Sequence, residues 1–90
     1  MAKIVVSYKI FPTDINVDFE KLKQIIEKNL PSQAEVYGYS IEPIAFGLNA
    51  LIAHIIFPED QSGILEDLEE KLKAIPEVSQ IQTIMVRRTH

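Results

Sequence analysis

The chain has 90 residues, the size of a single domain, and carries a formal charge of −4 from 13 acidic and 9 basic residues. The acidic balance argues against a dedicated nucleic-acid binder, and the absence of cysteine excludes disulfides and thiolate metal sites. No apolar run approaches the ~20 residues of a membrane span, and no signal-peptide pattern is present. We therefore expect one domain over residues 1–90, working in the cytoplasm without a membrane partner.

The first element is a predicted strand over residues 4–11, followed by a turn at Pro12 to Asp14. Alternate residues share one face of a strand, so one side of this strand is uniformly apolar and should face the core. The residues on that face are Ile4, Val6, Tyr8 and Ile10.

An amphipathic helix of about three turns is predicted next, with either Asn16 or Asp18 as its N-cap. Pro31 ends it, because the residue before a proline avoids the helical region. Its apolar stripe consists of Phe19, Leu22, Ile25, Ile26 and Leu30.

A second strand is predicted over residues 34–41, and Gly38 within it favours an edge position. A third strand over residues 48–57 is apolar on both faces, which is typical of a central strand. A fourth strand is predicted over residues 78–88. Its apolar run at Ile84 to Val86 breaks the alternation, which indicates either a bulge or an approach of other groups from both sides.

A second helix is predicted between the third and fourth strands, capped by Ser62 and ending near Ala74 before Pro76. Acid-before-base pairs four residues apart should stabilise its exposed side. These pairs are Asp67 with Lys71 and Glu69 with Lys73.

The predicted order is β-α-β-β-α-β. Two right-handed crossovers then give an α+β ferredoxin-like sandwich, a four-stranded antiparallel sheet with two helices on one face. The first and third strands should be central. This fold hosts many unrelated activities, so function must come from a site.

The connection between the second and third strands, residues 43–48, contains an unusual apolar run. Pro43 should interrupt regular pairing and Gly47 can adopt a positive φ, so a loop is expected. Ile44 and Phe46 could fold back onto their own core. Alternatively, Phe46 could project and fill a pocket on a partner, as aromatic anchors do at interfaces.

The sequence offers little for covalent chemistry. Its two histidines, His54 and His90, have no nucleophile pattern around them, and no cluster has metal-ligand or phosphate-loop spacing. We therefore expect no enzyme, metal or cofactor. The open sheet face should carry Ala50, Ile52, His54 and Ile56. It lacks the aromatic platform of RNA-binding sheets, so it is interpreted as a surface for protein contact or weak self-association.

Residues 42–48, E-P-I-A-F-G-L, together with the chain length and the V-R-R ending, resemble the archaeal form of elongation factor 1-beta. The resemblance covers the whole chain and implies the same fold. It also implies an exchange factor that releases GDP from, and loads GTP on, the GTPase elongation factor 1-alpha.

The resemblance further implies a partner-binding set of Pro43, Ile44, Phe46 and Gly47. The family's near-terminal basic residue, a lysine in eukaryotic members, falls on Arg88, with Arg87 as the other candidate. Arginine is bulkier and planar, so a role in mimicking a compact metal ion is less direct than the role of Phe46. Without the family, both arginines could simply be solubilising charge. We expect them to meet the same partner as Phe46.

A competing interpretation is a ferredoxin-like regulatory domain that binds small molecules and assembles through its open face. The sequence leaves open whether that face meets the GTPase or another copy of the chain.

Overall fold

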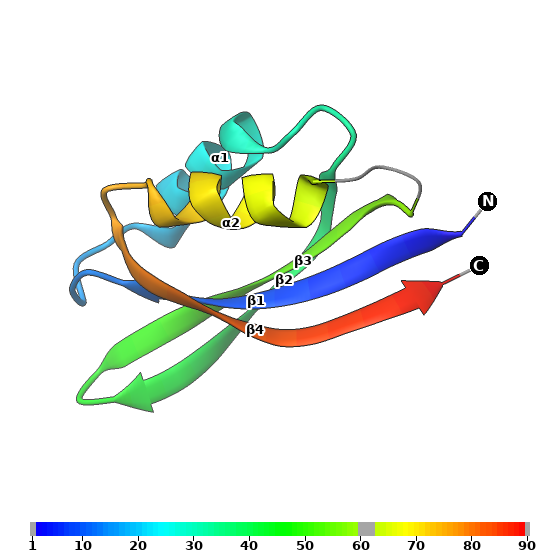
Figure 1. Cartoon of the computed structure of the whole chain (residues 1–90). Helices are drawn as coiled ribbons and strands as arrows, with labels where there is room; N and C mark the ends of the chain where they lie inside the picture. The colour runs from blue at the N-terminus through cyan, green and yellow to red at the C-terminus, as the bar shows by residue number, and fades with distance from the viewer. Residues whose placement is uncertain (1, 60–62, 90) are drawn as a thin grey trace.

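The computed structural model describes residues 2–59 and 63–89, and its elements follow the order expected from the sequence (Figure 1). The four strands and two helices form an α+β fold of the ferredoxin-like type, as predicted. In chain order they are β1 (Lys3–Pro12), α1 (Phe19–Asn29), β2 (Glu35–Ala45), β3 (Leu48–Pro58), α2 (Ile64–Lys73) and β4 (Val78–Thr89).

The strands form one antiparallel sheet in the order β2-β3-β1-β4. The predicted central positions of β1 and β3 and the edge position of β2 are therefore confirmed. Both helices cover the same face of the sheet, and the β2–β3 hairpin extends well beyond them (Figure 1). The molecule is accordingly elongated, with principal extents of 42 × 20 × 18 Å.

The core lies between the sheet and the helices. The even-numbered face of β1 is buried there, as the alternation predicted, and it meets the apolar stripes of both helices. Residues with no exposed surface include Val6, Tyr8, Ile10, Leu22, Ile26, Leu51, Ile55 and Leu68. No helix in the described part of the chain has the length and apolar character needed to cross a membrane.

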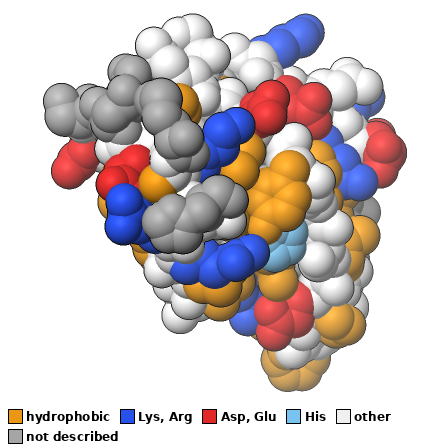
Figure 2. Space-filling model, turned by 90° about the vertical axis from the view of Figure 1, so that its right-hand side faces the viewer, with side chains coloured by type: hydrophobic (Ala, Val, Ile, Leu, Met, Phe, Trp, Pro, Cys, Tyr) orange, Lys and Arg blue, Asp and Glu red, His pale blue; other side chains and the backbone are white. Residues whose placement is uncertain are grey.

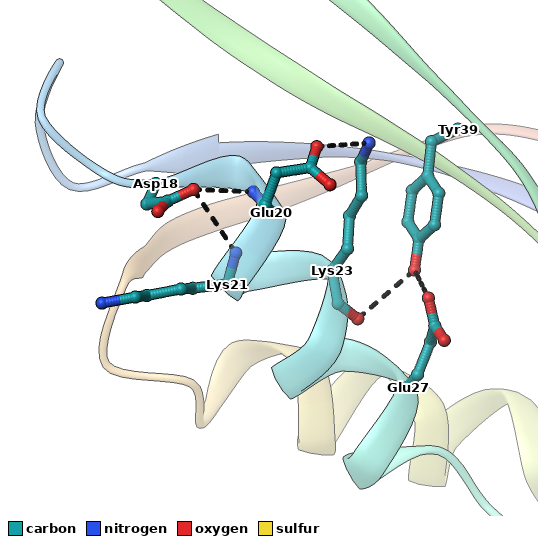
Figure 3. Close-up of polar contacts among 6 residues, drawn as sticks. All are labelled: Asp18, Glu20, Lys21, Lys23, Glu27 and Tyr39. Carbon is teal, nitrogen blue, oxygen red and sulfur yellow. Dashed lines mark hydrogen bonds and ion pairs between the residues drawn. The ribbon is translucent and has the colours of Figure 1, made fainter.

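Asp18 caps α1: its Oδ1 accepts from the backbone N–H groups of Glu20 (2.9 Å) and Lys21 (3.5 Å) (Figure 3). Of the two predicted candidates, Asp18 is therefore the cap. Tyr39 connects β2 to α1, because the Tyr39 hydroxyl donates a hydrogen bond to Glu27 Oε2 at 2.8 Å (Figure 3).

One of the two pairs predicted on α2 is confirmed: Lys71 Nζ lies 3.4 Å from Asp67 Oδ2. The other is wrong, because Glu69 accepts a hydrogen bond from the Tyr8 hydroxyl at 3.2 Å. Tyr8 reaches Glu69 from the buried face of β1, a contact that helical spacing could not reveal. The predicted cap Ser62 lies outside the described residues, and the described residue before α2 is Gly63.

The predicted irregularity in β4 is confirmed. Ser7 pairs with Met85 and Tyr8 pairs with Thr83, so Ile84 is the extra residue of a bulge. The expected loop over residues 43–48 is wrong in its extent. β2 continues through Pro43 to Ala45 with only a register shift, because an edge strand tolerates a missing N–H donor.

Candidate functional site: the tip of the β2–β3 hairpin

The hairpin turns within two residues. Ala45 pairs with Leu48, and both residues between them have positive φ, 53° at Phe46 and 79° at Gly47. Positive φ at both central positions is the signature of a type I′ turn, which matches the right-handed twist of paired strands. Such a turn favours asparagine or glycine, so a phenylalanine at its first central position is unexpected on local grounds.

The side chain of Phe46 is fully exposed, at 101% of its reference surface. The ring therefore projects from the domain, and the alternative that it folds back onto its own core is excluded. Ile44 and Ile41 on the preceding strand are also exposed, so the outer part of the hairpin presents several apolar side chains together. A tip of this composition is typical of a contact surface.

Two costs fall on Phe46 without any gain for the fold. A left-handed conformation costs a residue other than glycine about 1–3 kcal/mol. Leaving the ring in water also forgoes roughly 1.5–3 kcal/mol that its burial would contribute. Local strain of this kind concentrates at functional sites. The strained and exposed conformation of Phe46 is therefore typical of a residue at a contact site.

A hollow of about 230 Å³ lies beside the turn, between the hairpin and the β1–α1 connection. We call it the tip hollow. Its walls include Pro12, Asp14, Ile15, Phe19, Gly47 and Leu48. Gly47 thus belongs both to the turn that holds Phe46 outward and to the wall of the tip hollow. Sequence reasoning missed this feature; the available signal was an apolar residue, Ile15, between Asp14 and Asn16 in a polar turn.

The two arginines lie at the other end of the sheet. Arg87 pairs with Val5 and Arg88 with Ile4, near the start of β1, whereas the hairpin tip extends beyond the far end of β1. Figure 1 shows the C-terminus and the hairpin at opposite ends of the molecule. The arginines and Phe46 therefore lie on separate surfaces, and their contact with the same partner stays a prediction. Antiparallel pairing of β4 with β1 carries the end of β4 away from the tip.

The two arginines also differ from each other. Arg88 pairs with Ile4 on the helix-covered face and is joined to Glu59 by an ion pair. Arg87 pairs with Val5 and so lies on the open face. Figure 2 looks onto this end of the molecule and shows basic, acidic and hydrophobic side chains intermixed. The end of the sheet therefore carries charged groups beside the exposed apolar residues Ile84 to Val86 of β4, whereas the hairpin tip is apolar.

The open sheet face holds His54 in a short polar network. Its Nδ1 lies 2.7 Å from Ser7 Oγ, and its Nε2 lies 3.4 Å from Ser40 Oγ. The Tyr37 ring lies 5.7 Å from the imidazole, centroid to centroid. Ser7 is only 2% exposed, so this serine–histidine contact offers no access to a substrate. His54 is thus a partly shielded polar residue on the open face, where the sequence placed it.

Two tyrosines have shifted acidities, and both belong to the framework. Burial raises the pKa of the Tyr8 phenol, and the Glu69 carboxylate raises it further. Burial likewise raises the pKa of Tyr39, assisted by its hydrogen bond to Glu27. Within the described residues no group of three or more histidine, aspartate or glutamate side chains is arranged to hold a metal ion.

Comparison with known proteins identifies the family of the chain. The family model described as EF-1 guanine nucleotide exchange domain matches residues 5–89. Proteins named elongation factor 1-beta are similar over 98% of this chain. The one from Staphylothermus marinus is 48% identical over 98% of its own length, and the one from Aeropyrum pernix is 40% identical, also over 98%. The one from Ignicoccus hospitalis is 36% identical over 94% of its length.

Among solved structures, the C-terminal domain of the MgtC protein from Mycobacterium tuberculosis has a similar fold, with a TM-score of 0.58. The similarity covers 97% of this chain and 87% of that one. At 16% sequence identity it supports the fold assignment alone. The near full-length family match and the sequence identities to archaeal relatives are more specific. By these criteria the chain belongs to the elongation factor 1-beta family of EF-1 guanine nucleotide exchange domains.

Proposed function

We propose that this protein promotes release of GDP from elongation factor 1-alpha, and so its reloading with GTP, by inserting Phe46 into the GTPase. The observation that carries the proposal is the fully exposed Phe46 ring on a strained two-residue turn. A preformed turn holds the ring outward before contact, so little conformational entropy is lost on binding. Family membership supplies the class of partner.

In this proposal, exchange depends on the difference between two affinities of the factor, one for each nucleotide state of the GTPase. The factor must bind the nucleotide-free GTPase more tightly than the GDP-bound one, because equal affinity would leave the nucleotide equilibrium unchanged. GDP is held largely by contacts of its phosphates with the P-loop backbone and with Mg²⁺. A ring wedged into the GTPase would shift the segments that complete this phosphate site. The protein itself makes and breaks no covalent bond.

The basic end of β4 has a second, separate role in this proposal. The GTPase spans the long axis of the domain, so that the tip docks at one place and Arg87 or Arg88 approaches the Mg²⁺ and phosphate site at another. A guanidinium competes electrostatically with Mg²⁺ and forms bidentate contacts with phosphate oxygens. To act this way, Arg88 would have to exchange its pairing with Glu59 for contacts on the GTPase. The same proposal places the protein in the cytoplasm with its partner.

The direct test is release of a fluorescent GDP analogue from purified elongation factor 1-alpha, with and without the protein. We expect the wild-type chain to accelerate release and Phe46→Ala to lose most of that acceleration. No acceleration by the wild-type chain would refute the proposed function. Gel filtration adds a second measurement, because a one-to-one complex with the GTPase is expected and self-assembly through the open face is not.

A further inference from the structure

The tip hollow carries an inference beyond the projecting ring. Its walls come from three segments: the end of β1 with the following turn, the start of α1, and the start of β3. Ile15 stands at this hollow with 65% of its surface exposed, and Phe19 is only half-buried. The domain thus leaves apolar side chains of a mixed polar and apolar lining uncovered beside the turn that carries Phe46. Such a surface can insert one side chain into a partner and at the same time receive a side chain of that partner in the hollow.

The hollow also has a definite charge. Asp14 is its one ionisable side chain, since no lysine, arginine or histidine lines it. Asp14 Oδ1 accepts from the backbone N–H of Asn16 at 2.7 Å, which fixes the turn and the position of the carboxylate. The ion pairs formed among the described residues involve other carboxylates. The Asp14 charge therefore has no cation of this chain to neutralise it within the described structure.

We propose that the tip hollow receives one lysine or arginine side chain of the GTPase that binds Phe46. The aliphatic stem of such a side chain would cover Ile15, Phe19 and Leu48, while its charged head would meet Asp14. Long basic side chains combine an apolar stem with a cationic head, so they match a hollow lined by apolar side chains, the amide of Asn49 and the carboxylate of Asp14. A purely apolar occupant would leave that carboxylate desolvated and unpaired.

This inference rests on the proposed function for the identity of the partner, but it assigns a different contribution to the contact. The hollow contributes only to affinity and partner choice, whereas Phe46 contributes to affinity and is also expected to drive nucleotide release. Charge pairs at the rim of an interface act mainly on encounter and affinity, and salt screens them. The two contributions therefore differ in their kinetic and salt signatures.

The test uses Asp14→Asn, which keeps an oxygen to accept from Asn16 and removes only the charge. The matched control is Glu70→Gln, the same charge change at an exposed position on α2. Binding to purified elongation factor 1-alpha is titrated by calorimetry, and GDP release is measured against the concentration of this protein. For Asp14→Asn we expect binding weaker by about three- to tenfold, an equal rise in the half-saturating concentration, and an unchanged maximal release rate.

Salt gives the second readout. Raising the ionic strength should weaken wild-type binding more than Asp14→Asn binding, so the two converge, and Asp14→Lys should bind worse than either. If Asp14→Asn and Glu70→Gln bind alike at low salt, the hollow does not receive a cation and the inference is overturned. Failure of the proposed function looks different, because wild-type protein would then bind without accelerating GDP release, and the titrations would still decide the role of the hollow.

Discussion

Phe46 and Arg88 lie at opposite ends of the same sheet. Arg88 is level with Ile4 at the start of β1, whereas Phe46 projects beyond Leu51, the residue that pairs with Ile10. At about 3.3 Å of rise per strand residue, this places the two roughly 30 Å apart. One small pocket on a partner cannot accept both. If both act in exchange, they contact separate parts of the GTPase, and their substitution should give separable defects.

Replacing Phe46 with asparagine should separate function from folding. Asparagine suits the left-handed conformation and removes an exposed ring, so the free energy of unfolding should stay unchanged or rise by up to about 1 kcal/mol. Loss of the buried ring at the interface should lower affinity for the GTPase about tenfold or more. Thermal melting and stimulated GDP release measure the two effects.

The control for that variant is Tyr37→Ala, which removes another exposed aromatic ring from the open sheet face. It should leave stimulated GDP release close to the wild-type rate. Equal loss in both variants would mean that the tip has no special role.

Gly47→Ala should weaken the site through the backbone alone. A Cβ at this position would meet no atom within 4 Å, so the effect comes from the positive φ of 79° and not from a clash. We expect a loss of about 1 kcal/mol in the free energy of unfolding. A turn that relaxes toward negative φ would also redirect Phe46, so exchange should fall further than stability predicts. Gly38→Ala is the comparison, because Gly38 lies within β2 and does not have a positive φ. Unchanged exchange in Gly47→Ala would show that the turn geometry is not needed.

Arg88→Ala is expected to reduce the maximal rate of GDP release more than it reduces binding, because its proposed target is the Mg²⁺ and phosphate site. Arg87→Ala, on the opposite face of the same strand, shows which guanidinium is responsible. Glu59→Gln removes the ion-pair partner of Arg88 and should not lower release. A loss confined to binding in Arg88→Ala would instead indicate simple docking by this end of the sheet.

Stability should fall in alkaline solution because of Tyr8 and Tyr39. Their pKa values are raised in the folded state, so the folded protein holds its phenolic protons at a pH where the unfolded chain releases them. The contribution is fully present below the unfolded pKa of about 10 and is lost as the pH rises above it. Melting temperatures of wild type, Tyr8→Phe and Tyr39→Phe between pH 8 and 11 measure this.

In each of these variants the alkaline fall should be shallower than in wild type. At neutral pH Tyr8→Phe should cost about 1 kcal/mol for its lost hydrogen bond to Glu69. Tyr37→Phe is the control on the open face. Parallel pH curves for all four proteins would contradict the assigned cause.

The sequence by itself determined the elements and their layers. Apolar spacing predicted both helices, alternation predicted the buried face of β1, and Gly38 placed β2 at an edge. The interrupted alternation at Ile84 also predicted the irregularity in β4, which is a bulge. These signals are local, because they depend on which neighbouring residues share a face, and the hydrophobic effect acts on that pattern wherever the element lies.

Tertiary structure decided what the elements bring together. Whether Phe46 was buried depended on how far the hairpin extends past the helices, and its separation from Arg88 depended on strand register. Glu69 accepts from Tyr8, and Arg88 pairs with Glu59, through contacts between residues distant in the chain. The tip hollow likewise forms only where β1, α1 and β3 converge. Such relations are set by long-range packing of the whole sheet, which no short stretch of sequence encodes.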